Sequence, residues 1–238
     1  MTRLLLTLIV FCAFITQAQE LEIQGSFYTG GFYFQNNFLK EDVTLINLYN
    51  YSYTDIPYSQ RLGLLYGLSL NLTKTNPSKL RYGMDIGIET MKNRVDFQKV
   101  LNVKSDLSSD INQTGKTKLK LGFVNFFPKI GYQISKKSFR INVDGGIEVG
   151  VISKVIEKGN IPEITDRSPF TTNRKTRSFD FRPRLQIEFK KNKLGAYIAY
   201  SSGISNYIYI GAENKTFSKL FRLGVTYGLY KISLKKKD

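Results

Sequence analysis

The amino-acid sequence predicts an all-β protein, an eight-stranded antiparallel up-and-down transmembrane β-barrel preceded by a cleaved signal peptide. Three observations lead to this prediction. Stretches of alternating apolar and polar residues recur along the chain, charged residues occupy the polar face in mid-strand, and the connections alternate between long and short. Short periplasmic turns and longer external loops are typical of outer-membrane barrels, so this alternation favours such a barrel over a soluble sandwich.

The first 18 residues have the pattern of a secretory signal peptide. Arg3 gives a short basic start, an apolar run covers residues 4–15, and small residues precede the expected cleavage after Ala18. The apolar run is too short to cross a bilayer as a helix. We therefore expect residues 1–18 to be removed and residues 19–238 to form one domain in the outer membrane. The only cysteine, Cys12, lies in the removed part, so we expect no disulfide.

The clearest strands form a hairpin over residues 61–95, joined by a polar turn at residues 74–79. Period-2 alternation gives each strand one apolar and one polar face. The polar face carries Arg81, Asp85 and Glu89, and the apolar face is long enough to cross a bilayer at a tilt. We therefore expect the apolar face to contact lipid.

Six further strands follow the same alternation, although two of them are less regular. In the first strand, Gly30-Gly31 suggests a bulge or bend. In the fourth strand, Leu119 to Phe123 and Ile130 to Ile134 fall on opposite parities, so we expect a bulge near residues 125–128. The six expected strands are residues 22–35, 118–134, 139–151, 179–189, 194–200 and 221–230, and the long loops are residues 36–60, 96–117, 154–177 and 201–216.

Inward-facing charges follow a repeated spacing. The pattern Arg81, Asp85, Glu89 recurs as Arg140, Asp144, Glu148, and steps of four keep each set on one strand face. An eight-stranded barrel has room inside for side chains alone, and an unpaired buried charge costs about 3–5 kcal/mol. We therefore expect a lumenal charge network that plugs the barrel, with a narrow ion or proton path as the alternative. Its expected members are Arg81, Asp85, Glu89, Lys118, Lys120, Arg140, Asp144, Glu148, Asp180, Arg182, Arg184, Glu188 and Arg222.

The sequence contains few of the residue types and motifs that catalysis uses. The chain has no histidine, which removes the commonest general base and the commonest transition-metal ligand. No phosphate-binding loop, metal-ligand cluster or nucleophile elbow is present as a motif. Asp85 with Asp144, or Glu89 with Glu148, remains a candidate acid/base pair. We expect no enzymatic activity, no catalytic or metal-binding residue and no cofactor.

The formal charge of +16 bears on the expected partners. Export argues against nucleic acid and favours outer-membrane lipid and lipopolysaccharide, although solvated lysines at loops and turns explain the charge equally well. Lysines at the short turns suggest docking to a periplasmic protein, the long loops suggest a surface protein partner, and we expect a monomer. The candidate loop contacts are Tyr49, Tyr51, Tyr53, Tyr58, Arg167, Arg174, Lys175 and Arg177.

Four segments share features with one family of proteins. Residues 125–132 place a proline before an apolar run and a tyrosine, and residues 141–150 have a Gly-Gly centre. Two further segments, Phe-Asp-Phe at residues 179–181 and residues 195–204, lie in the last third of the chain. In these features the chain resembles PorT-type outer-membrane β-barrel domain proteins. The resemblance implies an integral outer-membrane protein with a structural or accessory role, in some members in protein secretion.

Two alternatives remain open. The first is a surface adhesin or lipopolysaccharide-binding barrel that uses the loops at residues 45–58 and 154–177. The second is a soluble periplasmic lipid-binding β-barrel with its apolar faces inward. That inversion would place Arg81, Asp85 and Glu89 in water.

Overall fold

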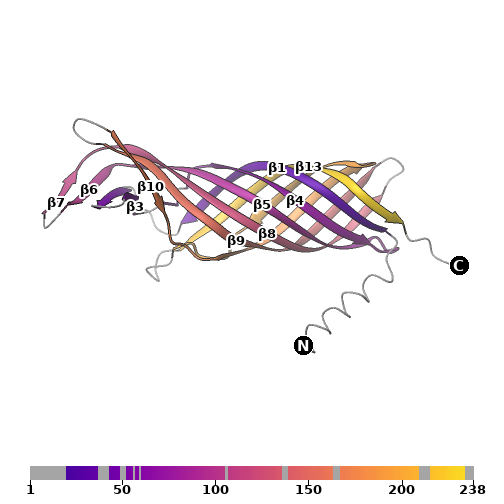
Figure 1. Cartoon of the computed structure of the whole chain (residues 1–238). Coiled ribbons are helices and arrows are strands. Elements are labelled where there is room, and N and C mark those ends of the chain that lie inside the picture. Colours follow the sequence, from indigo (N-terminus) through magenta and orange to yellow (C-terminus); the bar gives the residue numbers. More distant parts are fainter. Residues whose placement is uncertain are drawn as a thin grey trace, which may run out of the picture.

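The structure is a computed structural model that describes residues 20–36, 43–48, 52–55, 57–58, 60–104, 107–135, 139–162, 167–208 and 215–233. Eight antiparallel strands follow one another around a closed ring, and the last strand pairs with the first (Figure 1). This confirms the predicted barrel. The expected signal peptide lies outside the described residues and stays a prediction. The ring strands are β1 (Glu20–Asn36), β4 (Gly63–Thr75), β5 (Leu80–Phe97), β8 (Gly115–Ser135), β9 (Arg140–Pro162), β11 (Phe179–Lys191), β12 (Leu194–Ser202) and β13 (Thr216–Ser233).

The long loops carry strands of their own beyond one end of the ring (Figure 1). A separate four-stranded sheet has the order β3 (Ser52–Thr54), β2 (Thr44–Leu48), β6 (Lys99–Lys104), β7 (Leu107–Ile111), and β10 (Arg167–Asn173) pairs with the far end of β9. The pairing of β2 with β6 is parallel and joins the first long loop to the second. The sequence interpretation of these segments as plain loops was therefore incomplete.

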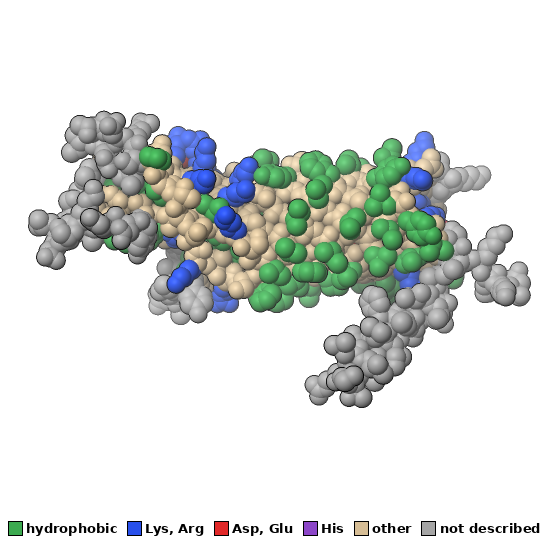
Figure 2. Space-filling model, in the orientation of Figure 1, with side chains coloured by type: hydrophobic (Ala, Val, Ile, Leu, Met, Phe, Trp, Pro, Cys, Tyr) green, Lys and Arg blue, Asp and Glu red, His purple; other side chains and the backbone are tan. Residues whose placement is uncertain are grey.

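The outer wall of the ring is apolar and the inner wall is polar. Leu70 on β4, Ile88 on β5 and Leu185 on β11 are each more than half exposed, at 58%, 59% and 56%. Figure 2 shows such side chains as a broad green belt with blue Lys and Arg side chains at both of its ends. Arg81, Asp85 and Glu89 are buried inside. A soluble protein has the opposite arrangement, so the outer wall is suited to lipid and the inverted, soluble barrel is not observed.

No helix among the described residues is both long and apolar enough to span a bilayer.

Both expected bulges were misplaced. The pairing of β1 runs without a shift through Gly30 and Gly31. β8 keeps one register through residues 125–128, continuously against β5 and with unpaired positions at Phe127 and Pro128 against β9. Register shifts occur instead at Ile23/Gln24 against β13 and at Gly122/Phe123 against β9. The second shift leaves Ser153 of β9 without a partner on β8.

The reason for the error is that apolar residues change faces along β8 while the backbone keeps its alternation. Leu119, Leu121 and Phe123 point inward and are buried, whereas Ile130 and its outward neighbours face the lipid side. Apolar side chains fill the barrel interior at the loop end, where the sequence interpretation allowed only polar ones. No phase slip is needed to account for the pattern.

Candidate functional site

The centre of the lumen holds six charged side chains from four strands, which we call the arginine cluster. Glu89 comes from β5, Glu148 from β9, and Arg222 from β13, while Asp180, Arg182 and Arg184 alternate along β11. Strand register places Arg182 directly opposite Glu148. Each side chain occupies an inward position of its strand, so the paired strands of the ring bring these side chains together at one height in the lumen.

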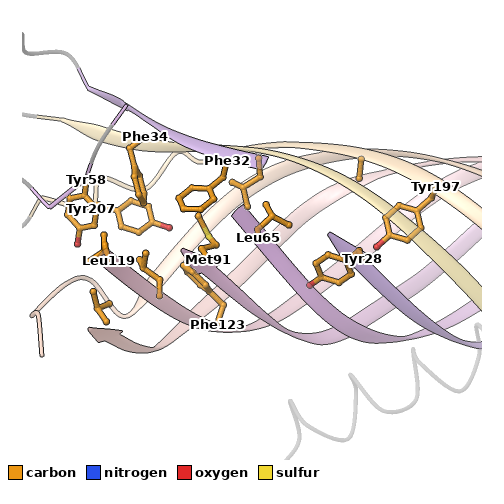
Figure 3. Packing of buried hydrophobic residues seen from close by; sticks show 14 residues of the cluster. Tyr28, Phe32, Phe34, Tyr58, Leu65, Met91, Leu119, Phe123, Tyr197 and Tyr207 are labelled. Atoms are coloured by element: carbon orange, nitrogen blue, oxygen red, sulfur yellow. The ribbon is translucent and has the colours of Figure 1, made fainter. Parts of the chain in front are cut away.

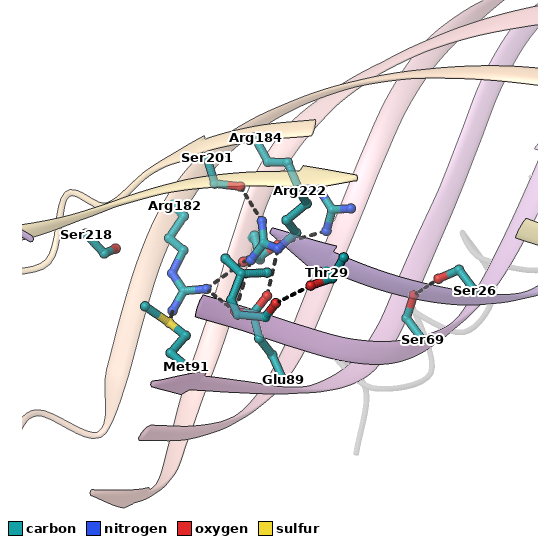
Figure 4. Close-up of polar contacts among 12 residues, drawn as sticks. Ser26, Thr29, Ser69, Glu89, Met91, Arg182, Arg184, Ser201, Ser218 and Arg222 are labelled. Carbon is teal, nitrogen blue, oxygen red and sulfur yellow. Dashed lines mark hydrogen bonds and ion pairs between the residues drawn. The ribbon is translucent and has the colours of Figure 1, made fainter. Parts of the chain in front are cut away.

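Both glutamates are fully engaged by guanidinium groups (Figure 4). Arg222 Nε lies 2.7 Å from Glu89 Oε2, and Arg182 Nη1 lies 3.0 Å from Glu89 Oε1. Glu148 Oε1 accepts from Arg182 Nη1 at 2.9 Å and from Arg222 Nη2 at 2.8 Å, and Glu148 Oε2 accepts from Arg184 Nη1 at 2.8 Å. Every carboxylate oxygen of the pair therefore has a cationic donor.

The cluster is balanced in charge and shielded from solvent. Three guanidinium groups face three carboxylates, because Asp180 Oδ2 also lies 2.6 Å from Arg182 Nε. Glu148, Arg182 and Arg222 have no exposed surface. Neither glutamate has an oxygen left for proton transfer to a substrate, so this arrangement favours a structural plug over the acid/base interpretation of Glu89 with Glu148.

A second cluster of charged side chains lies between the arginine cluster and the end of the barrel opposite the long loops. Lys129 Nζ lies 2.8 Å from Asp85 Oδ1 and 3.7 Å from Asp144 Oδ2, while Arg81 lies 3.5 Å from Asp144 and 3.9 Å from Glu188. Glu188 also accepts hydrogen bonds from the Asn142 and Thr226 side chains, both at 2.7 Å. The acid/base interpretation of Asp85 with Asp144 is disfavoured for a different reason, because the Lys129 ammonium lies between the two carboxylates. The sequence interpretation missed Lys129, although its position next to outward Ile130 indicates an inward side chain.

The rim at the chain termini holds a third group of ion pairs. Lys190 Nζ lies 2.5 Å from Glu22 Oε1, and Glu20 pairs with Lys231 at 2.8 Å and with Arg140 at 3.4 Å. Arg140 was expected in the lumenal network, and the structure places it at this partly exposed rim. Glu22 and Lys190 were not expected, because both lie in segments that the sequence interpretation took as strand ends or turns.

Lys118 and Lys120 were wrongly placed in the lumen. Both are exposed on the outer wall of β8. The reason is the parity of β8: Leu119 and Leu121 occupy the inward positions, so the lysines between them must face outward.

An aromatic cap closes the lumen between the arginine cluster and the external loops (Figure 3). The rings of Phe34, Tyr58 and Tyr207 meet edge to face, with centroids 4.9–5.3 Å apart. Below them, the Arg182 guanidinium lies 4.5 Å from the centroid of the Phe123 ring. Tyr58 was expected to be a surface contact, but it is buried at 4% exposure because the first long loop folds back over the opening.

The hydroxyl of Tyr207 connects the cap to the charges by donating to the Asp180 carboxylate. Burial, with a further contribution from Asp180, raises the pKa of Tyr207 well above its ordinary value. The phenol therefore keeps its proton and stays a donor. The Ser218 hydroxyl donates to the same carboxylate oxygen at 3.0 Å, which therefore accepts from Arg182, Tyr207 and Ser218.

The remaining candidate loop contacts divide into three groups. Tyr49, Tyr51 and the side chain of Arg167 lie outside what the structure describes. Arg174 is half-buried, stacks on Tyr53 at 4.9 Å and pairs with Glu157 at 3.3 Å, so both side chains serve the loop structure. Lys175 and Arg177 are exposed.

Glu157 fixes the first loop hairpin to the end of β9, and its removal tests this. Its carboxylate accepts from the Thr54 amide at 3.0 Å and the Thr54 hydroxyl at 2.6 Å, and it is fully buried. We expect Glu157→Ala to weaken the attachment by about 1–3 kcal/mol, because buried donors lose their partner. Limited proteolysis should then cleave residues 44–58 faster while the barrel stays intact. Lys175→Ala, which changes an exposed neighbour, should leave the cleavage rate unchanged, and equal rates in both variants would contradict the assignment.

Comparison with known proteins gives fold-level likeness only. No protein-family model and no curated protein matches the chain. Among solved structures, the outer membrane protease OmpT from Escherichia coli is 9% identical with a TM-score of 0.40, covering 88% of this chain and 96% of its own. Ail, the attachment invasion locus protein of Yersinia pestis, in complex with the heparin analogue sucrose octasulfate, is 13% identical with a TM-score of 0.33, covering 87% and 99%. A Pseudomonas aeruginosa FadL homologue is 8% identical with a TM-score of 0.22, covering 89% and 91%.

The structure itself defines the class of protein. A closed ring of eight antiparallel strands has an apolar belt outside, paired charges inside, short turns at one end and long structured loops at the other. These are the features of an outer-membrane β-barrel protein. Among the described residues, no group of three or more His, Cys, Asp or Glu side chains is arranged to hold a metal ion.

Proposed function

We propose that this protein is a non-conducting outer-membrane barrel with a structural or accessory role rather than a catalytic one. The observation that carries the proposal is the closure of the lumen by two barriers in series. The arginine cluster is a layer of mutually paired charges with no exposed surface at its centre, and the aromatic cap is a layer of buried rings above it. Moving an ion through would require both layers to part and would leave charges without partners.

Planar-bilayer recording tests this closure. Purified protein, shown to be folded by its unheated migration on a denaturing gel, should give no discrete conductance steps when it is inserted into a bilayer. A porin inserted under the same conditions provides the positive control. Reproducible open-channel steps from the folded protein would overturn the plugged barrel and favour the ion or proton path.

We propose protein secretion as the process that this barrel assists, a role that rests on the resemblance of residues 125–132 and 141–150 to PorT-type proteins. Deletion of the gene should then reduce the amount of secreted protein in the culture medium, with the outer membrane otherwise intact. Re-expressing the intact protein in the deletion strain should restore secretion. A deletion strain with normal secretion would refute this part of the proposal and leave the structural role.

Surface interaction is a second candidate, favoured by the ordered external sheet. β7 is an edge strand of that sheet, and β3, which pairs with β2, is held to β9 through Glu157. A fixed external sheet presents a defined surface, as an adhesin requires. Deleting residues 99–111 should abolish attachment of cells to their target and leave the heat-modifiable migration of the barrel unchanged. Unaltered attachment would exclude this sheet as the contact surface.

A further inference from the structure

Six basic side chains gather on the outer wall of three neighbouring strands, and we call them the outer basic patch. All six are exposed and face away from the lumen. They lie at the loop end of the apolar belt, where Figure 2 shows blue side chains bordering the green ones. The patch consists of Lys92 and Arg94 on β5, Lys118 and Lys120 on β8, and Lys154 and Lys158 on β9.

Strand register brings these like charges directly together. Lys92 is opposite Lys120, and Arg94 is opposite Lys118, which is in turn opposite Lys158. Directly opposed side chains in an antiparallel pair have Cβ atoms about 4.5–5.5 Å apart, and like charges there destabilise the sheet. Solvated lysines at flexible turns avoid this repulsion, but these positions are held fixed within the barrel wall.

Carboxylates supply little compensation within the part of the chain that the structure describes. Arg94 alone has an ion pair, with Asp96 at 3.8 Å, and Asp96 pairs more closely with Arg61 at 2.5 Å. Lys92 lies 5.1 Å from the centroid of the Tyr66 ring, which leaves its charge unneutralised. The patch therefore carries a concentrated positive field that is not cancelled by these neighbours.

The patch stands at the level of lipid headgroups. Going toward the loops, the last outward apolar positions before the first basic residue are Ile88 on β5, Val124 on β8 and Val151 on β9. On β9 one further outward apolar side chain, Ile156, lies between Lys154 and Lys158. On β9 the bulge at Ser153 reverses the alternation, so that Lys154 and Lys158 face outward while Glu157 is buried inside. Without the bulge, Lys154 would point into the lumen.

An open pocket beside this bulge extends the basic surface. Its basic lining consists of Lys154 and, from the segment before β11, Arg174, Lys175 and Arg177, of which Arg174 is paired with Glu157. Several cationic side chains around one hollow suit a tetrahedral phosphate group better than a carboxylate, because several oxygens can each accept a hydrogen bond.

We propose that the outer basic patch binds the phosphate groups of the anionic glycolipid in the outer leaflet, lipid A. The apolar belt below the patch contacts the acyl chains of the same molecule, so one ligand satisfies both surfaces. Phosphate also removes the repulsion between opposed lysines that the free protein carries. The inference rests on the outer-membrane placement of the barrel and goes beyond its proposed accessory role.

The test uses the full-length barrel, folded in a neutral detergent, with added bisphosphorylated lipid A or fully dephosphorylated lipid A. Phosphorylated lipid A should raise the unfolding temperature on a heat-modifiability gel, and the dephosphorylated form should not. In the triple variant Lys92→Gln, Lys118→Gln, Lys120→Gln, binding should be about a hundredfold weaker, since each lysine near an anionic lipid surface strengthens binding about fivefold. The matched control is Lys79→Gln, Lys191→Gln, Lys193→Gln, which removes three exposed lysines at the opposite end and should bind as the unaltered protein does.

Three outcomes would overturn the proposal. Equal stabilisation by both forms of lipid A would assign the effect to the acyl chains. Equal weakening in the two triple variants would assign it to net charge. An unfolding temperature raised by a soluble sulfated polysaccharide and not by lipid A would identify a soluble polyanion as the ligand. Each result is independent of conductance and secretion, so failure here leaves the plugged barrel in place.

Discussion

Replacing Arg222 with methionine is expected to lower the free energy of unfolding of the barrel by about 3–5 kcal/mol. The guanidinium donates to both Glu89 and Glu148 and also to the Ser201 hydroxyl at 2.7 Å. Its loss leaves the arginine cluster with three carboxylates and two guanidinium groups, so one negative charge is buried without compensation. Methionine preserves most of the side-chain volume, which separates the charge effect from a packing defect.

Urea titration in detergent micelles, followed by the heat-modifiable gel shift, measures this loss. Arg177→Met provides a matched control, because Arg177 is exposed in the segment before β11 and its replacement should change stability by less than about 0.5 kcal/mol. The double variant Glu89→Gln, Arg222→Met restores charge balance and should recover part of the loss. A single variant as stable as the control would show that the cluster does not stabilise the barrel.

Placing an arginine on the lipid face near the membrane centre is expected to cost about 2–4 kcal/mol. Leu70 suits this test because it lies on the outer wall of β4 within the apolar belt and is 58% exposed. In water, such an exposed leucine would accept arginine with little effect. In a bilayer the charge must enter hydrocarbon, so Leu70→Arg measures what surrounds the outer wall.

Leu62→Arg is the matched control, since Leu62 precedes β4 at the loop end of the same outward row and is 79% exposed. Its cost should be about 0–1 kcal/mol, because the effect declines toward the interface. Refolding into lipid vesicles and urea titration give both values. Equal costs at the two positions would contradict a membrane around β4.

The sequence predicted the ring of strands well because lipid and lumen impose opposite polarities on alternate residues. The pattern around Arg81, Asp85 and Glu89 is readable for this reason, and the structure places all three inside. Prediction failed where the interior is apolar. At Leu119 and Leu121 the same alternation continues with the polarities exchanged, which led to a false bulge and to Lys118 being turned inward.

The external structure was less predictable for a different reason. The parallel pairing of β2 with β6 depends on contacts between two loops that are distant in the sequence, and no local pattern records it. The burial of Tyr58 depends on the same folding of loop over barrel. Lys129 and Lys190, in contrast, could have been found from the alternation of their own strands.

The arginine cluster also has a consequence for how the barrel assembles. Its charges join β5 and β9 to β11 and β13, strands that are separated by long stretches of chain and are not all neighbours in the ring. A sheet that has inserted β5 and β9 but still lacks β13 would hold Glu89 and Glu148 without Arg222. Such an intermediate lacks a cation that pairs with both glutamates, and closure of the ring by β13 supplies it. The ion network thereby favours closure of the barrel, because β13 completes the charge balance of strands that precede it in the sequence.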